Sequence, residues 1–273
     1  MPVGGDGRER PGPVDAPVPV RGDGPERPGP VRPAGAAVHR SPCGGPHAAV
    51  DAQAVAARVQ VLRRRLEASG APPDLRIVAV TKGFGADAVA AALGAGIVDV
   101  GENYPSELFD KARSSFAVVP RWHFLGAIQR RHVRRIAPLV ALWHSVCRVQ
   151  EGEAIAACVP DAEVLVQVEL TGRSGRRGVE PSAVGPLLDG LRRCGVVPVG
   201  LMTLGVAGDR ALTDQVFRAT ADLARRVGVA QVSMGMSDDV ELAVAAGATI
   251  VRVGRALFGE RPPKFPREAV PPQ

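Results

Sequence analysis

Lysine is scarce in this sequence. Its 273 residues include 34 basic residues, of which only three are lysines (Lys82, Lys111 and Lys264) and the rest are arginines. This skew indicates a bias in residue usage, so the formal net charge of +6 is weak support for nucleic-acid binding. A sequence pI near 9.7 permits weak association with polyanions. We expect no nucleic acid among the specific partners.

Cysteine and histidine are scarce as well. The four cysteines are scattered without the Cys-x-x-Cys spacing of a redox pair or a zinc knuckle. None of the five histidines belongs to a two-histidine helical pair. The sequence therefore predicts reduced structural thiols and no metal site.

Long apolar runs are absent. No stretch approaches the roughly 18 uninterrupted apolar residues that a membrane span needs. The Pro/Gly/Arg-rich start also lacks the apolar region of a secretory signal. We expect a cytoplasmic protein without a membrane partner.

Residues 1–47 differ in composition from the rest of the chain. They contain 11 prolines and 10 glycines, a density that opposes helix, sheet and a packed core. Two ten-residue segments starting at Gly5 and Gly22, GDGRERPGPV and GDGPERPGPV, differ at one position. We interpret them as low-complexity duplication and predict a disordered tail. Residues 263–273 are predicted to be a C-terminal tail.

Residues 48–262 alternate between apolar runs and amphipathic segments. A helix is predicted over 49–68, where apolar residues recur at helical spacing. Eight near-continuously apolar runs follow, as expected for strands buried on both faces: they start at Leu75, Ile97, Trp122, Ala141, Glu163, Val196, Ala230 and Thr249. Helix-like segments separate them. This pattern predicts an α/β fold, a (β/α)8 TIM-type barrel. A doubly wound open sheet is the alternative, which the missing G-x-G-x-x-G motif disfavours.

Lys82 lies two residues beyond the first predicted strand, where a barrel builds its site from the loops that follow the strands. A solvated loop lysine is the ordinary interpretation. In a chain that otherwise uses arginine, however, a lysine at this position indicates amine chemistry. A desolvated ammonium group can lose its proton and condense with an aldehyde, whereas a guanidinium group stays protonated.

A candidate phosphate site follows the last two predicted strands. The segments Ser233–Asp239 and Arg252–Arg255 carry small and hydroxylated residues, and the corresponding loops form the usual phosphate cradle of this fold. The alternative is ordinary helix capping by Ser237, with Asp238 and Asp239 complementing the helix dipole. Both interpretations are compatible.

Two further polar positions follow predicted strands. Asn103, in the GENY segment, is a candidate ligand contact, and its neighbour Glu102 is a candidate partner for a base or an arginine. Capping explains this segment about as well. His123 alternates with two aromatic residues in WHFLG, a pattern that favours core packing over catalysis.

Together these segments resemble the pyridoxal phosphate homeostasis proteins, a family whose barrel is similar to the N-terminal domain of alanine racemase. The resemblance covers about residues 75–261. The segments that carry it are VAVTK, GENY, WHFLG, HSV, GLMT, SMGMSDD and VRVGRALFG, in this order.

The resemblance implies a set of contacts with pyridoxal 5′-phosphate (PLP). Lys82 is implied to carry PLP as a Schiff base, with Asn103 beside the pyridine ring and Arg252 facing the pyridine nitrogen. The phosphate is implied to bind Ser233, Ser237, Gly254 and the backbone of Arg255. An arginine at the ring nitrogen disfavours the protonated pyridine that makes PLP an effective electron sink. Weak carbanion chemistry is therefore expected.

Two departures from the family pattern bear on affinity. Arg255 replaces the small hydroxyl residue usual after VRIG, and Cys147 replaces the aspartate usual after HSV. The loss of a hydroxyl at position 255 removes one possible phosphate contact and leaves the backbone N–H group.

The leading hypothesis is a non-catalytic PLP carrier that serves intracellular PLP homeostasis. Apo forms of PLP-dependent enzymes are its candidate recipients, and a monomer or weak dimer is expected. The alternatives are a racemase-like PLP enzyme acting on amino acids, a metal-free aldolase-like enzyme, and a nucleic-acid binder using the arginines of residues 130–135. For the last, the run lacks interleaved aromatics, so a solvated helix is favoured.

Overall fold

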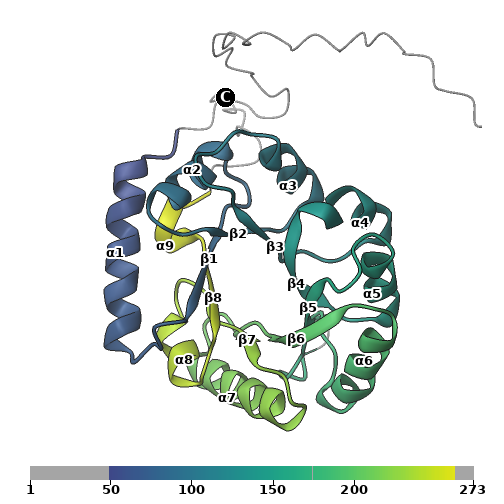
Figure 1. Ribbon diagram of the computed structural model, residues 1–273. Coiled ribbons are helices and arrows are strands. Elements are labelled where there is room, and N and C mark those ends of the chain that lie inside the picture. The colour runs from purple at the N-terminus through teal and green to yellow at the C-terminus, as the bar shows by residue number, and fades with distance from the viewer. Residues whose placement is uncertain (1–48, 174, 262–273) are drawn as a thin grey trace, which may run out of the picture. The chain divides into compact units, whose positions relative to one another are not determined.

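The strands close into a parallel barrel. The computed structural model describes residues 49–173 and 175–261, and within them eight strands hydrogen-bond in chain order around a ring (Figure 1). The strands are β1 (Arg76–Val80), β2 (Asp99–Glu102), β3 (Arg121–Phe124), β4 (Val140–Val146), β5 (Glu163–Gln167), β6 (Val197–Met202), β7 (Gln231–Ser233) and β8 (Ile250–Val253). β8 pairs with β1, with Ile250 opposite Arg76 and Val253 opposite Ala79. The predicted TIM-type barrel is confirmed, and an open sheet is excluded.

Helices alternate with the strands. They are α1 (Ala52–Ala68), α2 (Ala86–Gly94), α3 (Pro105–Ala112), α4 (Arg130–Ile136), the 3-10 helix η1 (Ala137–Leu139), α5 (Val149–Ala156), α6 (Pro181–Arg193), α7 (Arg210–Arg226), α8 (Val240–Ala245) and α9 (Arg255–Phe258). The helix predicted over 49–68 begins at Ala52, because the Asp51 side chain accepts hydrogen bonds from the N–H groups of Gln53 and Ala54. The predicted tails, 1–47 and 263–273, lie outside the described residues.

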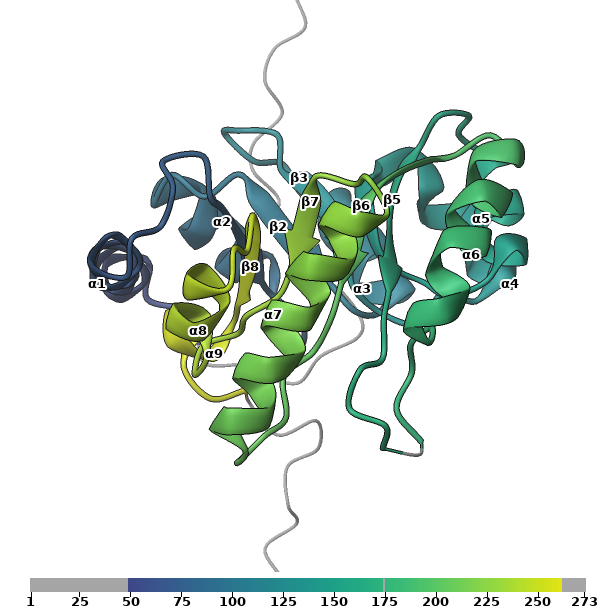
Figure 2. The same cartoon turned by 90° about the horizontal axis from the view of Figure 1, so that it is seen from below.

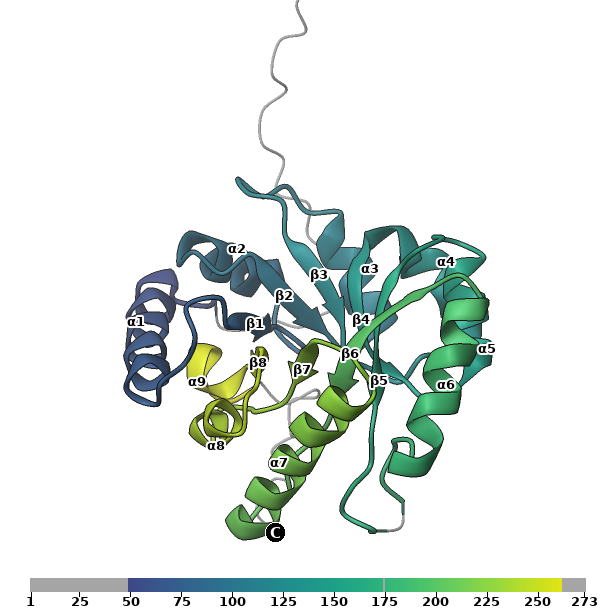
Figure 3. The ribbon, with the colours of Figure 1, turned by 60° about the horizontal axis from the view of Figure 1, so that its bottom comes forward.

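The main hydrophobic core lies between the barrel and its helices. Figure 3 shows α1 and α2 beside β1, and α5 and α6 beside β5. The largest fully buried side chains in this layer are Trp143, Phe124 and Phe217. Each large apolar side chain stabilises the fold by about 1.5–3 kcal/mol when it is withdrawn from water. This apolar layer holds the strands in position. It thereby also positions the carboxyl ends of the strands, where the cavity lies.

A smaller core fills the barrel interior. It contains Val78, Leu142, Leu165, Met202 and Ile250, each from a different strand. Buried polar side chains, among them His123, His144 and Arg252, share this interior with them. The interior is therefore only partly the layered apolar packing that is usual for this fold.

Figure 2 shows the segment between β5 and α6 extending away from the sheet. Among the described residues, no helix combines the length and the apolar character needed to cross a membrane. The same residues contain no cluster of metal-binding side chains. The free cysteines Cys147, Cys158 and Cys194 are all partly exposed and form no disulfide.

Candidate functional site

A cavity of about 790 Å³ lies at the carboxyl ends of the strands. This volume falls within the range of small-molecule sites. Its wall is formed largely by loops that follow β1, β2, β7 and β8. These loops, the strand β8 and the start of α9 supply Lys82, Asn103, Ser237, Arg252, Gly254 and Arg255. Six of the seven residues predicted from the sequence therefore lie together, although they are far apart in the chain.

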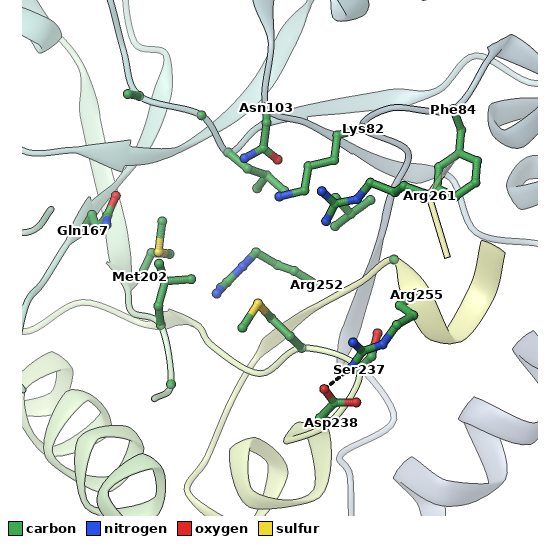
Figure 4. Close-up of a pocket in the computed structure, with 18 of the residues that line it drawn as sticks. Lys82, Phe84, Asn103, Gln167, Met202, Ser237, Asp238, Arg252, Arg255 and Arg261 are labelled. Atoms are coloured by element: carbon green, nitrogen blue, oxygen red, sulfur yellow. Dashed lines mark hydrogen bonds and ion pairs between the residues drawn. The ribbon is translucent and has the colours of Figure 1, made fainter. Parts of the chain in front are cut away.

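The Lys82 amine points into this cavity (Figure 4). Burial lowers the pKa of Lys82 below its ordinary value of 10.5, and the positive charges of Arg261 and Arg252 lower it further. Glu102 and Glu107 act in the opposite direction but do not outweigh these effects. The arrangement increases the fraction of free amine near neutral pH.

The residues on both sides of Lys82 are held by buried and partly buried charged groups. Lys111 Nζ donates a hydrogen bond of 2.8 Å to the carbonyl oxygen of Thr81. The Thr81 hydroxyl donates to Glu102 Oε1 at 2.6 Å, and the N–H group of Gly83 donates to Glu107 Oε2 at 2.7 Å. The loop that carries Lys82 is therefore attached at the residues before and after it.

Lys111 and Glu102 form the buried ion pair of this cluster. Their Nζ and Oε1 atoms lie 2.5 Å apart, and their side chains are 7% and 0% exposed. Burial raises the pKa of Glu102, while the hydrogen bonds from Lys111 and Thr81 oppose the increase. Glu102, a candidate partner for a base or an arginine, is thus paired with a lysine. Lys111 itself was missed, because a lysine within a predicted helix is usually solvated.

Asn103 is positioned by a close approach of two loops. A Cβ atom at Gly126 would lie 1.9 Å from the Asn103 carbonyl oxygen, so only glycine fits there. The Asn103 side chain lines the cavity, and its Oδ1 atom is buried without a hydrogen-bond partner. A buried amide in this state leaves a position open for a ligand atom.

Arg252 reaches the cavity from β8 and is 5% exposed. Its Nη1 donates to Ser233 Oγ at 2.6 Å, and its Nη2 donates to the Thr203 carbonyl oxygen at 2.8 Å. Burial lowers the pKa of Arg252 to about 10, and the charge of Asp239 opposes the decrease. The guanidinium group therefore stays positively charged at pH 7.

Ser233 is the seventh residue of the predicted site, where it was expected to bind the phosphate. It is fully buried at the end of β7 and does not line the cavity. Its hydroxyl lies between Arg252 Nη1 and His144 Nδ1, at 2.6 and 3.0 Å. Because the Ser233 side chain points into the barrel interior, its hydroxyl contacts Arg252 and does not face the cavity.

The remaining phosphate candidates surround the start of α9. Ser237 Oγ accepts a hydrogen bond of 3.1 Å from the N–H group of Ala256, and the Arg255 side chain is paired with Asp238. Ser237 therefore connects two loops and does not cap α8, whose N-cap is Asp239. The capping interpretation of Ser237 was wrong.

Backbone donors are available in these loops. Within the described residues, the N–H groups of Ser237 and Arg255 make no hydrogen bond. A Cβ atom at Gly254 would lie 3.2 Å from the Val80 carbonyl oxygen, so the small residue keeps the β8 loop close to β1. Free N–H groups beside a glycine are suited to binding an anion.

Several cavity residues had no signal in the sequence. Arg176 and Arg177 enter from the segment between β5 and α6, and Arg261 follows α9. Arg176 is paired with Glu169 at 3.1 Å, and Arg177 with Glu151 at 2.8 Å. Arginines are so frequent in this chain that composition could not single these out.

Cys147 and the arginines of α4 lie outside the cavity. The N–H group of Cys147 donates to Glu151 Oε2 at 2.7 Å, and burial raises the pKa of the Cys147 thiol. Arg130, Arg131, Arg134 and Arg135 are exposed on α4. The Arg135 guanidinium lies 3.8 Å from the centre of the Phe109 ring. Their exposure agrees with the prediction of a solvated helix.

Comparison with known proteins gives consistent matches. The profile of the family described as "Alanine racemase, N-terminal domain" matches residues 50–262. The pyridoxal phosphate homeostasis protein of Deinococcus radiodurans is 37% identical over 198 residues, which cover 70% of this chain and 92% of that protein. PipY of Synechococcus elongatus, solved with and without PLP, is 30% identical with a TM-score of 0.68. That match covers 75% of this chain and 100% of PipY.

The chain belongs to the alanine racemase N-terminal domain family. Within this class it belongs to the pyridoxal phosphate homeostasis proteins. Alanine racemase of Bacillus anthracis also has the fold, with a TM-score of 0.61 at 19% identity. That match covers 78% of this chain and 57% of the racemase, and it supports the fold alone.

Proposed function

We propose that this chain binds PLP through a Schiff base on Lys82 and serves PLP homeostasis with little catalysis of its own. The observation that carries the proposal is the Lys82 amine, which points into a cavity of about 790 Å³ and has a lowered pKa. The PLP-bound structure of PipY, at 30% identity, supports the same cofactor.

The residues around the cavity fit the groups of PLP. Asn103 Oδ1 is a buried polar atom without a partner, beside the loop of Lys82. The free N–H groups of Ser237 and Arg255, next to Gly254, suit the phosphate. Because Ser233 lies below the cavity, we assign it no direct phosphate contact.

PLP supplies an aldehyde that condenses with an amine, and a ring that withdraws electrons. The protein contributes an amine that loses its proton readily, because Lys82 is partly buried near Arg252 and Arg261. Arg252 is the candidate partner of the pyridine nitrogen, since its side chain lines the cavity between Lys82 and Ser237 (Figure 4). A permanently charged donor at that nitrogen disfavours its protonation.

The proposed non-catalytic role follows from the shortage of acid–base groups around Lys82. Among the described residues that line the cavity, none is a histidine, cysteine or tyrosine. The carboxylates Asp238 and Glu260 belong to side chains that are 76% and 85% exposed. We propose that the protein is a carrier for this reason. We also propose that it is cytoplasmic, a monomer or weak dimer, and that apo PLP-dependent enzymes receive the cofactor. A racemase-like enzyme is the second candidate, because the barrel is shared with alanine racemase.

The test is an absorption spectrum of the full chain after incubation with PLP. We expect the visible band of a Schiff base, its loss on borohydride reduction, and a modified peptide that contains Lys82. The absence of this band at saturating PLP, or modification confined to Lys111 or Lys264, would contradict the proposal. Transfer to apo-enzymes is measured separately, as activation of an apo-transaminase by the loaded protein.

A further inference from the structure

A chain of hydrogen bonds runs through the barrel interior from β2 to the cavity. His123 Nε2 lies 2.7 Å from Asp99 Oδ1, and His123 Nδ1 lies 2.8 Å from His144 Nε2. His144 Nδ1 lies 3.0 Å from Ser233 Oγ, which also accepts a hydrogen bond of 2.6 Å from Arg252 Nη1. None of the five residues is more than 7% exposed.

The five residues come from β2, β3, β4, β7 and β8. Asp99 is the first residue of β2, at the end of the barrel opposite the Lys82 cavity. It borders a second cavity, of about 410 Å³, together with Arg76. The chain therefore connects the two ends of the barrel through residues that no single helix or strand could bring together.

The chemistry of the two end groups fixes the order of the protons. Arg252 can only donate, so Ser233 Oγ accepts from it and the Ser233 hydroxyl is free to donate to His144 Nδ1. Asp99 as a carboxylate can only accept, so His123 carries its proton on Nε2. With neutral rings, His144 Nε2 then donates to His123 Nδ1.

This order gives each of the four contacts one donor and one acceptor. The reverse order would place the unprotonated Nε2 of His123 against the Asp99 carboxylate. A protonated His123 would force His144 to donate to Ser233, whose own hydroxyl would then lose its acceptor. A carboxylate at one end and a guanidinium at the other therefore stabilise one arrangement of both histidines.

The surrounding charges favour the same state. Burial lowers the pKa of both histidines, although the Asp99 hydrogen bond partly opposes this for His123. Burial raises the pKa of Asp99, but the hydrogen bond from His123 and the charges of Arg121 and Arg76 outweigh it, and the pKa lies below its ordinary value. At neutral pH the rings are uncharged and Asp99 is ionised.

The charged groups near Arg252, at the cavity end of these hydrogen bonds, are Lys82 and Asp239. Arg252 lowers the pKa of Lys82, and Asp239 stabilises the charge of Arg252 from the β7 loop. No carboxylate forms a salt bridge with Arg252 within the described residues. Its direct partners among the described residues are the Ser233 hydroxyl and the Thr203 carbonyl oxygen, so Ser233 is the one described side chain that holds it.

We propose that Ser233, His144 and His123 are positioning residues for Arg252, and that Asp99 sets their proton order from the opposite end of the barrel. The inference rests on the proposed function in one respect, because Arg252 is the group that we place at the pyridine nitrogen. The row of hydrogen bonds holds the Arg252 guanidinium in place as a donor. The remaining N–H groups of Arg252 are left for the cavity.

The first arm of the test needs no PLP. Nitrogen-15 NMR of the histidine-labelled full chain at pH 7 reports which ring nitrogen carries the proton. We expect Nε2–H and an unprotonated Nδ1 at both His123 and His144. Asp99→Asn keeps an acceptor for His123 but adds an amide donor, so His144 should then populate both neutral tautomers. Nδ1–H at either ring of the wild type would overturn the proposed order.

The second arm uses PLP as the probe. Ser233→Ala should shift the visible band of bound PLP and raise its Kd about tenfold, the factor expected for one net hydrogen bond. Asp99→Asn should change the band in the same direction by a smaller amount. Glu163→Gln is the control. It removes an exposed carboxylate from the first residue of β5, which takes no part in these hydrogen bonds, and it should change neither the visible band nor the Kd.

The outcomes separate the two proposals. A wild-type protein without a visible band refutes the proposed function, while the NMR arm still tests the proton order. A normal band in the wild type that Ser233→Ala leaves unchanged in position and affinity overturns the positioning role. An Asp99→Asn variant that matches Glu163→Gln in both arms overturns the role of Asp99.

Discussion

Lys111 Nζ lies 2.8 Å from the carbonyl oxygen of Thr81, so a buried lysine holds the residue that precedes Lys82. The same ammonium group is paired with Glu102 Oε1 at 2.5 Å. Lys111 is therefore held by buried partners, whereas Lys82, the lysine that we propose to be reactive, makes no hydrogen bond within the described residues.

Replacing Lys111 by methionine should destabilise the fold. The change leaves Glu102 buried without its cation, and breaking a buried pair in this way costs about 3–5 kcal/mol. Urea unfolding followed by circular dichroism measures the loss. The double variant Lys111→Met/Glu102→Leu should recover most of it, since the unpaired carboxylate is then removed. Equal stability of the single variant and the wild type would show that the pair contributes little.

Lys82→Ala should abolish covalent PLP and leave the fold intact. The Lys82 side chain is partly exposed and makes no hydrogen bond within the described residues, so we expect a change below about 1 kcal/mol in the free energy of unfolding. Borohydride trapping and peptide mass measure the loading. Lys264→Ala is the matched control and should load normally. Trapped cofactor in Lys82→Ala would place the Schiff base elsewhere.

The rate of Schiff-base formation should rise with pH through the lowered pKa of Lys82, because only the free amine attacks the aldehyde. Arg261→Gln removes a positive charge that lowers this pKa. The pKa should therefore rise, and the midpoint of the pH–rate profile should move to higher pH by up to about one unit. Stopped-flow absorbance measures the profile. Arg130→Gln, on the exposed face of α4, should leave the midpoint in place.

Acid should weaken the fold through His144 and His123. Their folded-state pKa values lie below the ordinary 6.5, so the unfolded chain binds more protons below about pH 6.5. The free energy of unfolding should then fall as pH decreases, by up to about 1.4 kcal/mol per pH unit for each histidine. Asp99, whose pKa lies below 3.8, adds a loss at still lower pH.

Denaturant unfolding between pH 7 and pH 5 checks this slope. His132→Gln serves as the control, because His132 lies on α4 outside the barrel interior and should leave the slope unchanged. A slope that stays flat in the wild type would show that the two buried rings are not held neutral.

Alanine racemisation should be negligible. Two-base racemisation needs an acid–base group on each face of the substrate carbon, and the described cavity residues supply Lys82 without a histidine, cysteine or tyrosine as the second group. Incubation of loaded protein with L-alanine, followed by chiral chromatography, measures D-alanine beside free PLP. Turnover of the order of 1 s⁻¹ would place the protein among ordinary enzymes and favour the racemase-like alternative.

The fold was predictable because strands buried on both faces appear as short apolar runs. All eight predicted strands are present, with bounds within a few residues. Lys82, Asn103 and Arg252 were predictable as a group because the carboxyl ends of barrel strands converge. The position of a residue directly after a predicted strand is sufficient to predict that it lies at this end of the barrel.

Side-chain direction was not predictable in the same way. Ser233 belongs to a motif that precedes a phosphate loop, but its hydroxyl points into the barrel interior. His123 was predicted to pack in the core, and it is indeed buried, but its polar partners Asp99 and His144 come from other strands. Such contacts depend on the register between neighbouring strands, which the pattern of apolar residues does not specify.

The closure of the ring between β8 and β1 has a consequence for biosynthesis. Lys82 and Asn103 lie near the beginning of the barrel, whereas Ser237, Arg252 and Gly254 lie near its end. At about 5–20 residues per second, roughly ten to thirty seconds separate the synthesis of Lys82 from that of Gly254. During this interval a nascent chain presents the amine without the loops that follow β7 and β8. The complete cofactor pocket therefore exists only after the last strand has left the ribosome and paired with the first.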